Sequence, residues 1–236
     1  MPRPSRNSWL LRRAESALRS GFERAYETVR VDPQHYLFHL RAAHGLPISS
    51  FQGVYSLPLE QLDALAAGTI RAGMKIAALE GAGLGLGGIL TLVPDLGILS
   101  VVTLRTVQKL SLIYGFEFNT DEEVSELWVA TASAAGVDIG RELVEKEVVN
   151  KFVPRVIERI AARASVEVVE KWSARVIPLL SSVLGAGLNY YFVRGWGERA
   201  AKHFRERHLQ RRGQMALPAA QPLSLPASDR RPGISD

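Results

Sequence analysis

Two long apolar segments, each interrupted by glycine and proline, constrain the fold of this chain more than any other feature of its sequence. Residues 82–104 contain one charged side chain, Asp95, and residues 176–193 contain none. A helix of about 20 apolar residues can cross a bilayer, so both segments need to be hidden by lipid or by other helices. Pro94, Pro178 and the closely spaced glycines favour interrupted helices or helical hairpins over straight spans.

The insertion energy of the first segment does not decide between lipid and protein surroundings. Its twelve Leu, Ile and Val residues favour insertion by about 4–7 kcal/mol, whereas Asp95 opposes it by about 2.5–3.5 kcal/mol. Pro94 and the glycines offset most of the remainder. We expect Asp95 either to cap the helix that follows Pro94 or to pair with Arg105, Lys109 or helix amides. A membrane-contacting hairpin and the tightly packed core of a soluble bundle both remain open.

The rest of the chain has the apolar spacing of amphipathic helices and almost no strand-like alternation. The sequence therefore predicts an all-α fold, a single multi-helix bundle with two Gly/Pro-interrupted apolar helical hairpins. We divide it into N-terminal basic helices over 1–54, a helical domain over 55–212 and a disordered Pro-rich tail over 213–236.

Local capping signals predict where several helices begin. Ser8 and the Asp32-Pro33 pair each resemble the start of a helix, because a short polar side chain can accept hydrogen bonds from the first free amides. Thr120 opens a capping box, and we expect its helix to continue to about Phe152.

Positive charge is concentrated towards the two ends of the chain. Residues 1–24 carry six Arg against two Glu, and residues 194–212 carry seven Arg and Lys against two Glu. Such regions suit lipid phosphates, or they form solvated helix faces. One tryptophan and its basic neighbours are typical of an anchor at a membrane surface, namely Trp196, Arg194, Arg199, Lys202 and Arg205. The alternative is a core tryptophan on a helix whose basic face is solvated.

No pattern in the chain predicts an active site. The absence of Cys excludes disulfides, thiolate catalysis and Cys-ligated zinc. Gly83, Gly85 and Gly88 have the spacing of a dinucleotide fingerprint, but a predicted helix rather than a strand precedes them. His35 and His39 share a helical face without a third local ligand. We therefore expect a non-enzymatic protein with no cofactor and no metal site.

The two apolar segments carry motifs that resemble the EcsC family. The first has a glycine-rich run, a Pro-Asp-Leu break, a Leu-Arg pair and a Tyr-Gly-aromatic, and the second has an Ile-Pro, a Gly-Ala-Gly and an Asn-Tyr. The likeness covers about residues 55–210 and departs at Gly97, where the family often has Pro. The motif positions are Glu80, Gly81, Gly83, Gly85, Gly87, Gly88, Pro94, Asp95, Arg105, Tyr114, Gly115, Pro178, Gly185 and Asn189.

The resemblance implies a mainly bacterial family, named after an operon that encodes the ATPase and membrane subunit of an ABC transporter, with no catalytic residues to transfer. One hypothesis is a membrane-associated protein that is accessory to such a transporter or to an envelope process and that meets anionic lipid or a membrane protein. The other is a soluble helical protein-binding module with a tightly packed Gly-rich core.

The apolar run Trp9–Leu11 is too short for a secretory signal. We therefore expect a cytoplasmic protein, peripheral to the inner membrane or partly inserted in it. Nucleic-acid binding through residues 194–212 has no supporting motif, and nucleic acid is not an expected partner.

Overall fold

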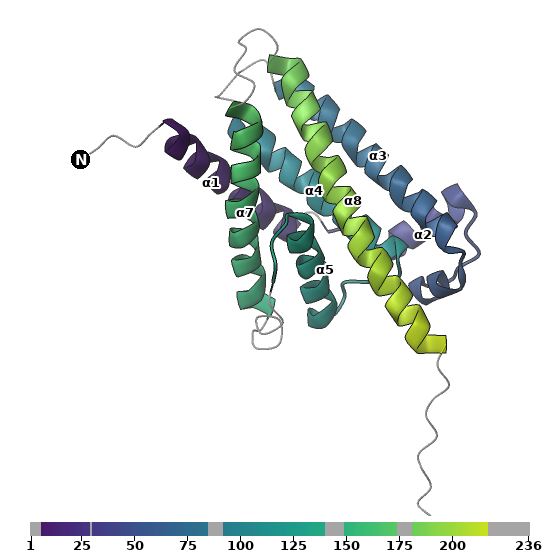
Figure 1. The fold of residues 1–236 in the computed structure, drawn as a ribbon. Coiled ribbons are helices and arrows are strands. Elements are labelled where there is room, and N and C mark those ends of the chain that lie inside the picture. The colour runs from purple at the N-terminus through teal and green to yellow at the C-terminus, as the bar shows by residue number, and fades with distance from the viewer. Residues whose placement is uncertain (1–5, 29, 85–91, 140–148, 174–180, 217–236) are drawn as a thin grey trace, which may run out of the picture.

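The computed structural model describes residues 6–28, 30–84, 92–139, 149–173 and 181–216, and every structural statement below concerns these residues. All their regular elements are helical, which confirms the predicted all-α fold (Figure 1). The elements are α1 (Arg6–Thr28), α2 (Pro33–His44), the 3-10 helix η1 (Phe51–Ser56), α3 (Leu59–Leu84), α4 (Leu92–Ile113), α5 (Asp121–Ala134), α7 (Val149–Ser173) and α8 (Ser181–Ala216).

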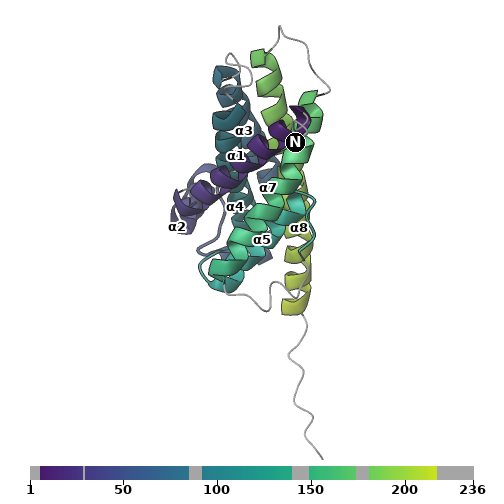
Figure 2. The ribbon, with the colours of Figure 1, turned by 90° about the vertical axis from the view of Figure 1, so that its left-hand side faces the viewer.

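Helix α4 lies at the centre of the bundle. It packs against α1, α3, α5 and α8, while α1 crosses the bundle from the side of α7 towards α2 (Figure 2). Within the described chain, the window Leu96–Ile113 of α4 is long and apolar enough to cross a membrane, but 72% of its residues are buried inside the protein. The burial is that of a core helix, whose apolar side chains are covered by protein rather than by lipid.

The capping signals predict two of the three helix starts correctly. The Asp32 carboxylate accepts hydrogen bonds from two backbone amides of α2. The side chains of Thr120 and Glu123 each accept a hydrogen bond from the other residue's amide at the start of α5. The prediction at Ser8 is wrong, since α1 is already helical at Arg6.

The predicted continuation of the helix from Thr120 to about Phe152 is also wrong. Helix α5 ends at Ala134, because Gly136 adopts a left-handed backbone conformation with φ of 73°. The amide of Val137 then donates to the carbonyl of Ala132 at 2.9 Å. This arrangement closes the helix as a glycine C-cap does.

The first apolar segment belongs to two helices. Helix α3 continues to Leu84 and α4 begins at Leu92, so a hairpin turn between them falls on residues outside the described chain. Pro94 lies in the first turn of α4, where its missing amide costs no hydrogen bond. Asp95 is inside the helix, so the prediction that it caps the helix is wrong, and its side chain is not described.

The second apolar segment is continuous with the basic region. Residues 181–193 form one unbroken helix, α8, with the basic residues that follow them, and Pro178 lies outside the described residues. Helix α8 also includes residues 213–216, which the sequence assigned to a disordered tail. Residues 217–236 are not described.

Glycines allow α1 and α3 to approach α4 closely. A Cβ atom at Gly73 would lie 2.6 Å from the Thr106 hydroxyl oxygen, and one at Gly21 would lie 2.8 Å from the Ser100 hydroxyl oxygen. Both separations are shorter than a carbon–oxygen contact allows, so these two positions require glycine. The close packing holds α1 and α3 on either side of one face of α4.

Candidate functional site

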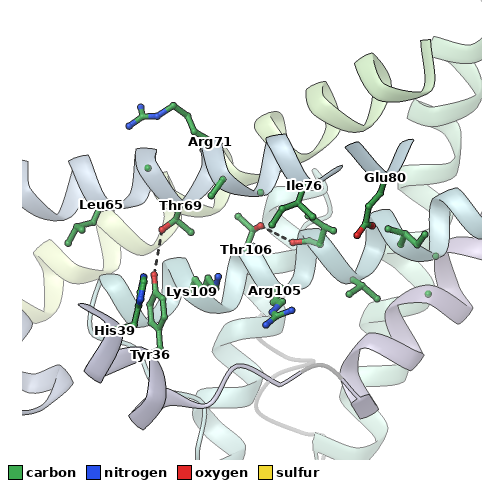
Figure 3. A pocket seen from close by; sticks show the side chains of 18 of the residues that line it. Tyr36, His39, Leu65, Thr69, Arg71, Ile76, Glu80, Arg105, Thr106 and Lys109 are labelled. Carbon is green, nitrogen blue, oxygen red and sulfur yellow. Dashed lines mark hydrogen bonds between the residues drawn. The ribbon is translucent and has the colours of Figure 1, made fainter. Parts of the chain in front are cut away.

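A half-open groove of about 1520 Å³ lies between these helices (Figure 3). Its floor is the face of α4 from Gly97 to Lys109, and its walls come from α1 and α2 on one side and α3 on the other. The volume exceeds the roughly 300–1,000 Å³ of ordinary small-molecule pockets. The groove exists because both walls carry small side chains one helical turn apart, namely Ala17, Gly21, Ala64, Gly68 and Ala72.

The described side chains that line the groove carry more positive than negative charge. Arg105 and Lys109 lie one turn apart on the floor, and Arg24 lies on the α1 wall. Within the described chain, neither Arg24 nor Arg105 has a hydrogen-bond or ion-pair partner for its side chain. Burial, and then the charge of Arg105, lower the pKa of Lys109. An anion in the groove would relieve this repulsion.

The two ends of the groove differ in polarity. At one end the Tyr36 hydroxyl lies 3.5 Å from that of Thr69, and the Tyr36 ring lies beside His39. Figure 3 shows Lys109 and Arg105 along the middle of the groove and Ile76 and Glu80 towards the other end, whereas Arg71 points away. Towards Glu80 the lining is mostly apolar, with Ile76, Ile98, Val101 and Val102. A polar and cationic part therefore continues into an apolar part.

A second feature is a set of exposed apolar side chains in the last third of α3 and the first third of α8, here named the apolar end: Ile76, Leu79, Tyr190 and Tyr191. Leu79 is 75% exposed and Tyr191 is 56% exposed. The Asn189 amide donates to the carbonyl of Ala77 at 3.5 Å, so Tyr190 and Tyr191 of α8 lie level with the last third of α3. The end of α3, the end of α7 and the starts of α4 and α8 all lie at this end of the bundle (Figures 1 and 2).

Trp196 lies in the core and not on a surface. Its side chain is fully buried, and its ring stacks on Phe22 at 5.8 Å and on Phe192 at 4.8 Å between ring centroids. This placement agrees with the core interpretation of Trp196 and not with an interfacial anchor, because an anchor has to reach the headgroups.

The four basic residues grouped with Trp196 have partners within the protein. Arg205 donates to Asp63 at 3.0 Å, and Arg199 donates to the carbonyl of Ala134 at the end of α5. The other two form exposed pairs one turn apart, Arg194 with Glu198 at 2.8 Å and Lys202 with Glu206 at 4.0 Å. Partners from α3, α5 and α8 itself therefore satisfy the cations that the sequence assigned to a membrane surface.

Tyr114 and Gly115 support the same region of α8. The Tyr114 hydroxyl donates to Asp63 at 2.9 Å, and burial followed by this hydrogen bond raises the pKa of Tyr114. Gly115 has a positive φ of 85°, and a Cβ atom there would lie 2.9 Å from the ring of Tyr55. Tyr114 therefore joins the end of α4 to α3, and Gly115 packs against Tyr55 of η1.

Comparison with known proteins decides the family. The EcsC protein family model matches residues 15–209. This chain belongs to the EcsC protein family. It is 28% identical over 160 residues to Protein EcsC of Bacillus subtilis (strain 168), an alignment that covers 66% of this chain and 67% of that protein. No solved structure matches the chain. The resemblance inferred from the motifs is confirmed, and the matched range also includes most of α1 and all of α2.

The EcsC motif positions that have described contacts separate into two groups in the structure. Glu80 and Arg105 line the groove, whereas Tyr114, Gly115 and Asn189 join helices. The remaining positions carry no described side-chain contact: Gly81 and Gly83 lie in α3, Pro94 and Asp95 lie in α4, Gly185 lies in α8, and Gly85, Gly87, Gly88 and Pro178 lie outside the described residues.

No motif in the sequence predicts the groove directly. A stripe of small residues at 64, 68 and 72 runs along a different face of α3 from its large apolar residues, and it indicates where a wall can be hollow. The floor and the other wall come from α4 and α1, so their meeting depends on tertiary packing. The residues that the structure describes contain no group of three or more His, Cys, Asp or Glu that could share a metal ion.

Proposed function

We propose that this EcsC-family chain is a non-enzymatic peripheral protein of anionic membranes, and that it docks through the apolar end. The observation that carries this proposal is the exposure of Leu79 and Tyr191 at the end of the bundle where both apolar sequence segments are attached. Water-exposed leucine and tyrosine at one end of a bundle suit the boundary between headgroups and acyl chains.

The sequences that adjoin the apolar end support the same mode of contact. Residues 85–91 have no charged side chain, and residues 174–180 have one, Arg175. Nearby, the exposed Lys75 has no hydrogen-bond or ion-pair partner within the described chain. Each basic residue near an anionic surface contributes about 1 kcal/mol of attraction.

Docking from the surface fits the burial of α4 better than a membrane span. The span-length window Leu96–Ile113 is mostly covered by α1, α3, α5 and α8, so crossing the bilayer would require opening the core. We place the protein on the cytoplasmic leaflet, where anionic lipid is the primary partner and a membrane protein such as an ABC transporter subunit is a further one.

Vesicle flotation tests this proposal. The purified chain is mixed with vesicles of phosphatidylglycerol and phosphatidylcholine, or of phosphatidylcholine alone, and centrifuged through a density gradient. We expect flotation with the anionic vesicles only. The variant Leu79→Asp/Tyr191→Asp should stay in the bottom fraction with an unchanged circular dichroism spectrum, because both substituted side chains are exposed.

The matched control is Phe38→Asp, which replaces an apolar side chain that is 67% exposed on α2. It should float like the unmodified chain. Absence of flotation on anionic vesicles, or equal flotation of the Leu79→Asp/Tyr191→Asp variant, contradicts the proposal.

A second candidate is a soluble protein-binding module. It is supported by the contacts of Gly73 and Gly21, because they show that glycines outside the glycine-rich run serve core packing. This candidate predicts a monodisperse protein without detergent that fails to float on vesicles of either composition.

A further inference from the structure

We infer that the groove between α1, α2, α3 and α4 binds one anionic lipid molecule, with its headgroup at Arg105 and Lys109 and one acyl chain along the apolar part of the floor. The inference adds a bound ligand to the proposed function. It rests on the proposed function in one respect, namely that the membrane is the source of the lipid. No described side chain fills the groove, and its volume of about 1520 Å³ is more than a small polar metabolite needs.

The headgroup site is defined by positively charged side chains that lack described ion-pair partners. The side chains of Arg24 and Arg105 have no hydrogen-bond or ion-pair partner within the described chain. The Nζ atom of Lys109 lies 5.8 Å from the centroid of the Tyr36 ring. Among the described residues that line the groove, one is acidic, Glu80, and it lies towards the other end (Figure 3). A carboxylate or phosphate between the α4 cations and Arg24 would form charge-assisted hydrogen bonds that no described residue supplies.

The acyl-chain site follows from the direction of the groove. From Arg105 towards the start of α4, the floor is lined by Val102, Val101 and Ile98. The adjoining α3 wall carries Ile76. Ile76 is also 48% exposed and belongs to the apolar end. The apolar part of the groove therefore continues into the surface proposed to meet the membrane. A lipid that enters from this surface would pass its headgroup in first and leave its acyl chain nearest the membrane.

The chain's own C-terminal region lacks the negative charge expected of a ligand for the groove. Residues 217–236 contain two Asp and two Arg and have no net charge, so they would leave the groove cations uncompensated. An anionic lipid supplies the missing charge and the apolar length in one molecule.

Calorimetric titration of the full chain with laurate, below the concentration at which laurate forms micelles, tests the inference without a membrane. Dodecyl maltoside has a tail of the same length and no charge. We expect one laurate per chain and binding of dodecyl maltoside that is at least about tenfold weaker. Arg105→Gln should weaken laurate binding about tenfold, since it removes one charge-assisted interaction.

Two variants fill the groove, Gly97→Leu from the α4 floor and Gly68→Leu from the α3 wall. A Cβ atom at Gly97 has nothing within 4 Å, and one at Gly68 meets only the end of Arg71 at 4.0 Å, so Gly97→Leu and Gly68→Leu can fold. Each should weaken laurate binding at least about tenfold, Gly97→Leu by occupying the tail site and Gly68→Leu by narrowing the polar end beside Thr69. The matched controls are Gly213→Leu, on an open part of α8, and Lys151→Gln, an exposed lysine on α7. Both should bind laurate like the unmodified chain.

The outcomes separate this inference from the membrane proposal. Laurate binding without vesicle flotation supports lipid binding in the groove and contradicts membrane docking. Flotation without laurate binding supports membrane docking and contradicts lipid binding in the groove. The inference is overturned if a folded Gly97→Leu or Gly68→Leu variant binds laurate undiminished. It is also overturned if dodecyl maltoside binds as tightly as laurate, because the groove would then be a general apolar surface.

Discussion

The two basic regions of this molecule differ in whether their charges are satisfied. Along α8, Arg199, Arg205 and Arg207 each donate to an oxygen atom on α3 or α5. In the groove, Arg24 and Arg105 have no such partner within the described chain. Both regions are rich in arginine, yet only the groove retains charge for a ligand.

The difference shows why a basic stretch of sequence is a poor guide to a binding surface. The oxygen that Arg205 contacts belongs to Asp63, which lies 142 positions earlier in the chain. Cations in α8 serve to hold helices together, and their pairing removes much of their attraction for an external anion. Four predictions test this contrast, beginning with the largest expected effect.

Trp196→Ala should lower the free energy of unfolding by about 3–5 kcal/mol, because it leaves a cavity among Phe22 and Phe192 in the core. Tyr191→Ala, at the exposed apolar end, should change it by less than about 0.5 kcal/mol. Urea denaturation followed by circular dichroism measures both. A stable Trp196→Ala variant that has lost only membrane binding would restore the anchor interpretation.

Asp63→Asn should lower the free energy of unfolding by about 1–3 kcal/mol. The change removes the charge that Arg205 pairs with and weakens the acceptor for the Tyr114 hydroxyl. The ion pair is partly exposed, which limits the loss. The same denaturation measurement applies, and a loss below about 0.5 kcal/mol would mean that the α8 cations are not structural.

His208 should make α8 sensitive to acid. Its ring is fully buried, Nδ1 donates to the Tyr114 carbonyl at 2.9 Å, and Nε2 has no partner among the described residues. Burial lowers the pKa of His208 and outweighs the opposing effect of its hydrogen bond to the Tyr114 carbonyl. The charge of Arg212 lowers this pKa further, and the charge of Asp63 opposes it.

Because the folded state then binds this proton less readily than the unfolded state, the contribution of His208 is complete above a pH of about 6.5. It declines as the pH falls from there through the folded-state pKa. Denaturation at pH 7.5 and 5.5 should show a loss of stability that is smaller in His208→Gln. An equal loss in both proteins would refute the assignment.

Arg105→Gln should change the free energy of unfolding by less than about 0.5 kcal/mol in either direction, because no partner is lost and repulsion of Lys109 is relieved. Chemical denaturation of the variant beside Asp63→Asn provides the comparison. Destabilisation of 2 kcal/mol or more would show that Arg105 has a structural partner and would remove the contrast between the two regions.

The parts of the fold that depend on neighbouring residues follow from the sequence. The caps at Asp32 and Thr120 are correct because a side chain and the amides two or three residues later decide them. The end of α5 also depends on a neighbouring residue, because the C-cap glycine is Gly136. A glycine at this position is a signal in the sequence for the end of the helix. By contrast, the burial of Trp196 and the hollow above Arg105 arise where α1, α4 and α8 meet, and no local pattern encodes them.

The most direct test of the contrast is a titration of the chain with laurate, followed through the side-chain Nε–H signals of ¹⁵N-labelled arginine. The account predicts saturable shifts for Arg24 and Arg105, with little change for Arg199 and Arg205. Shifts of the α8 signals with unchanged groove signals would contradict it, because the functional positive charge would then lie on α8.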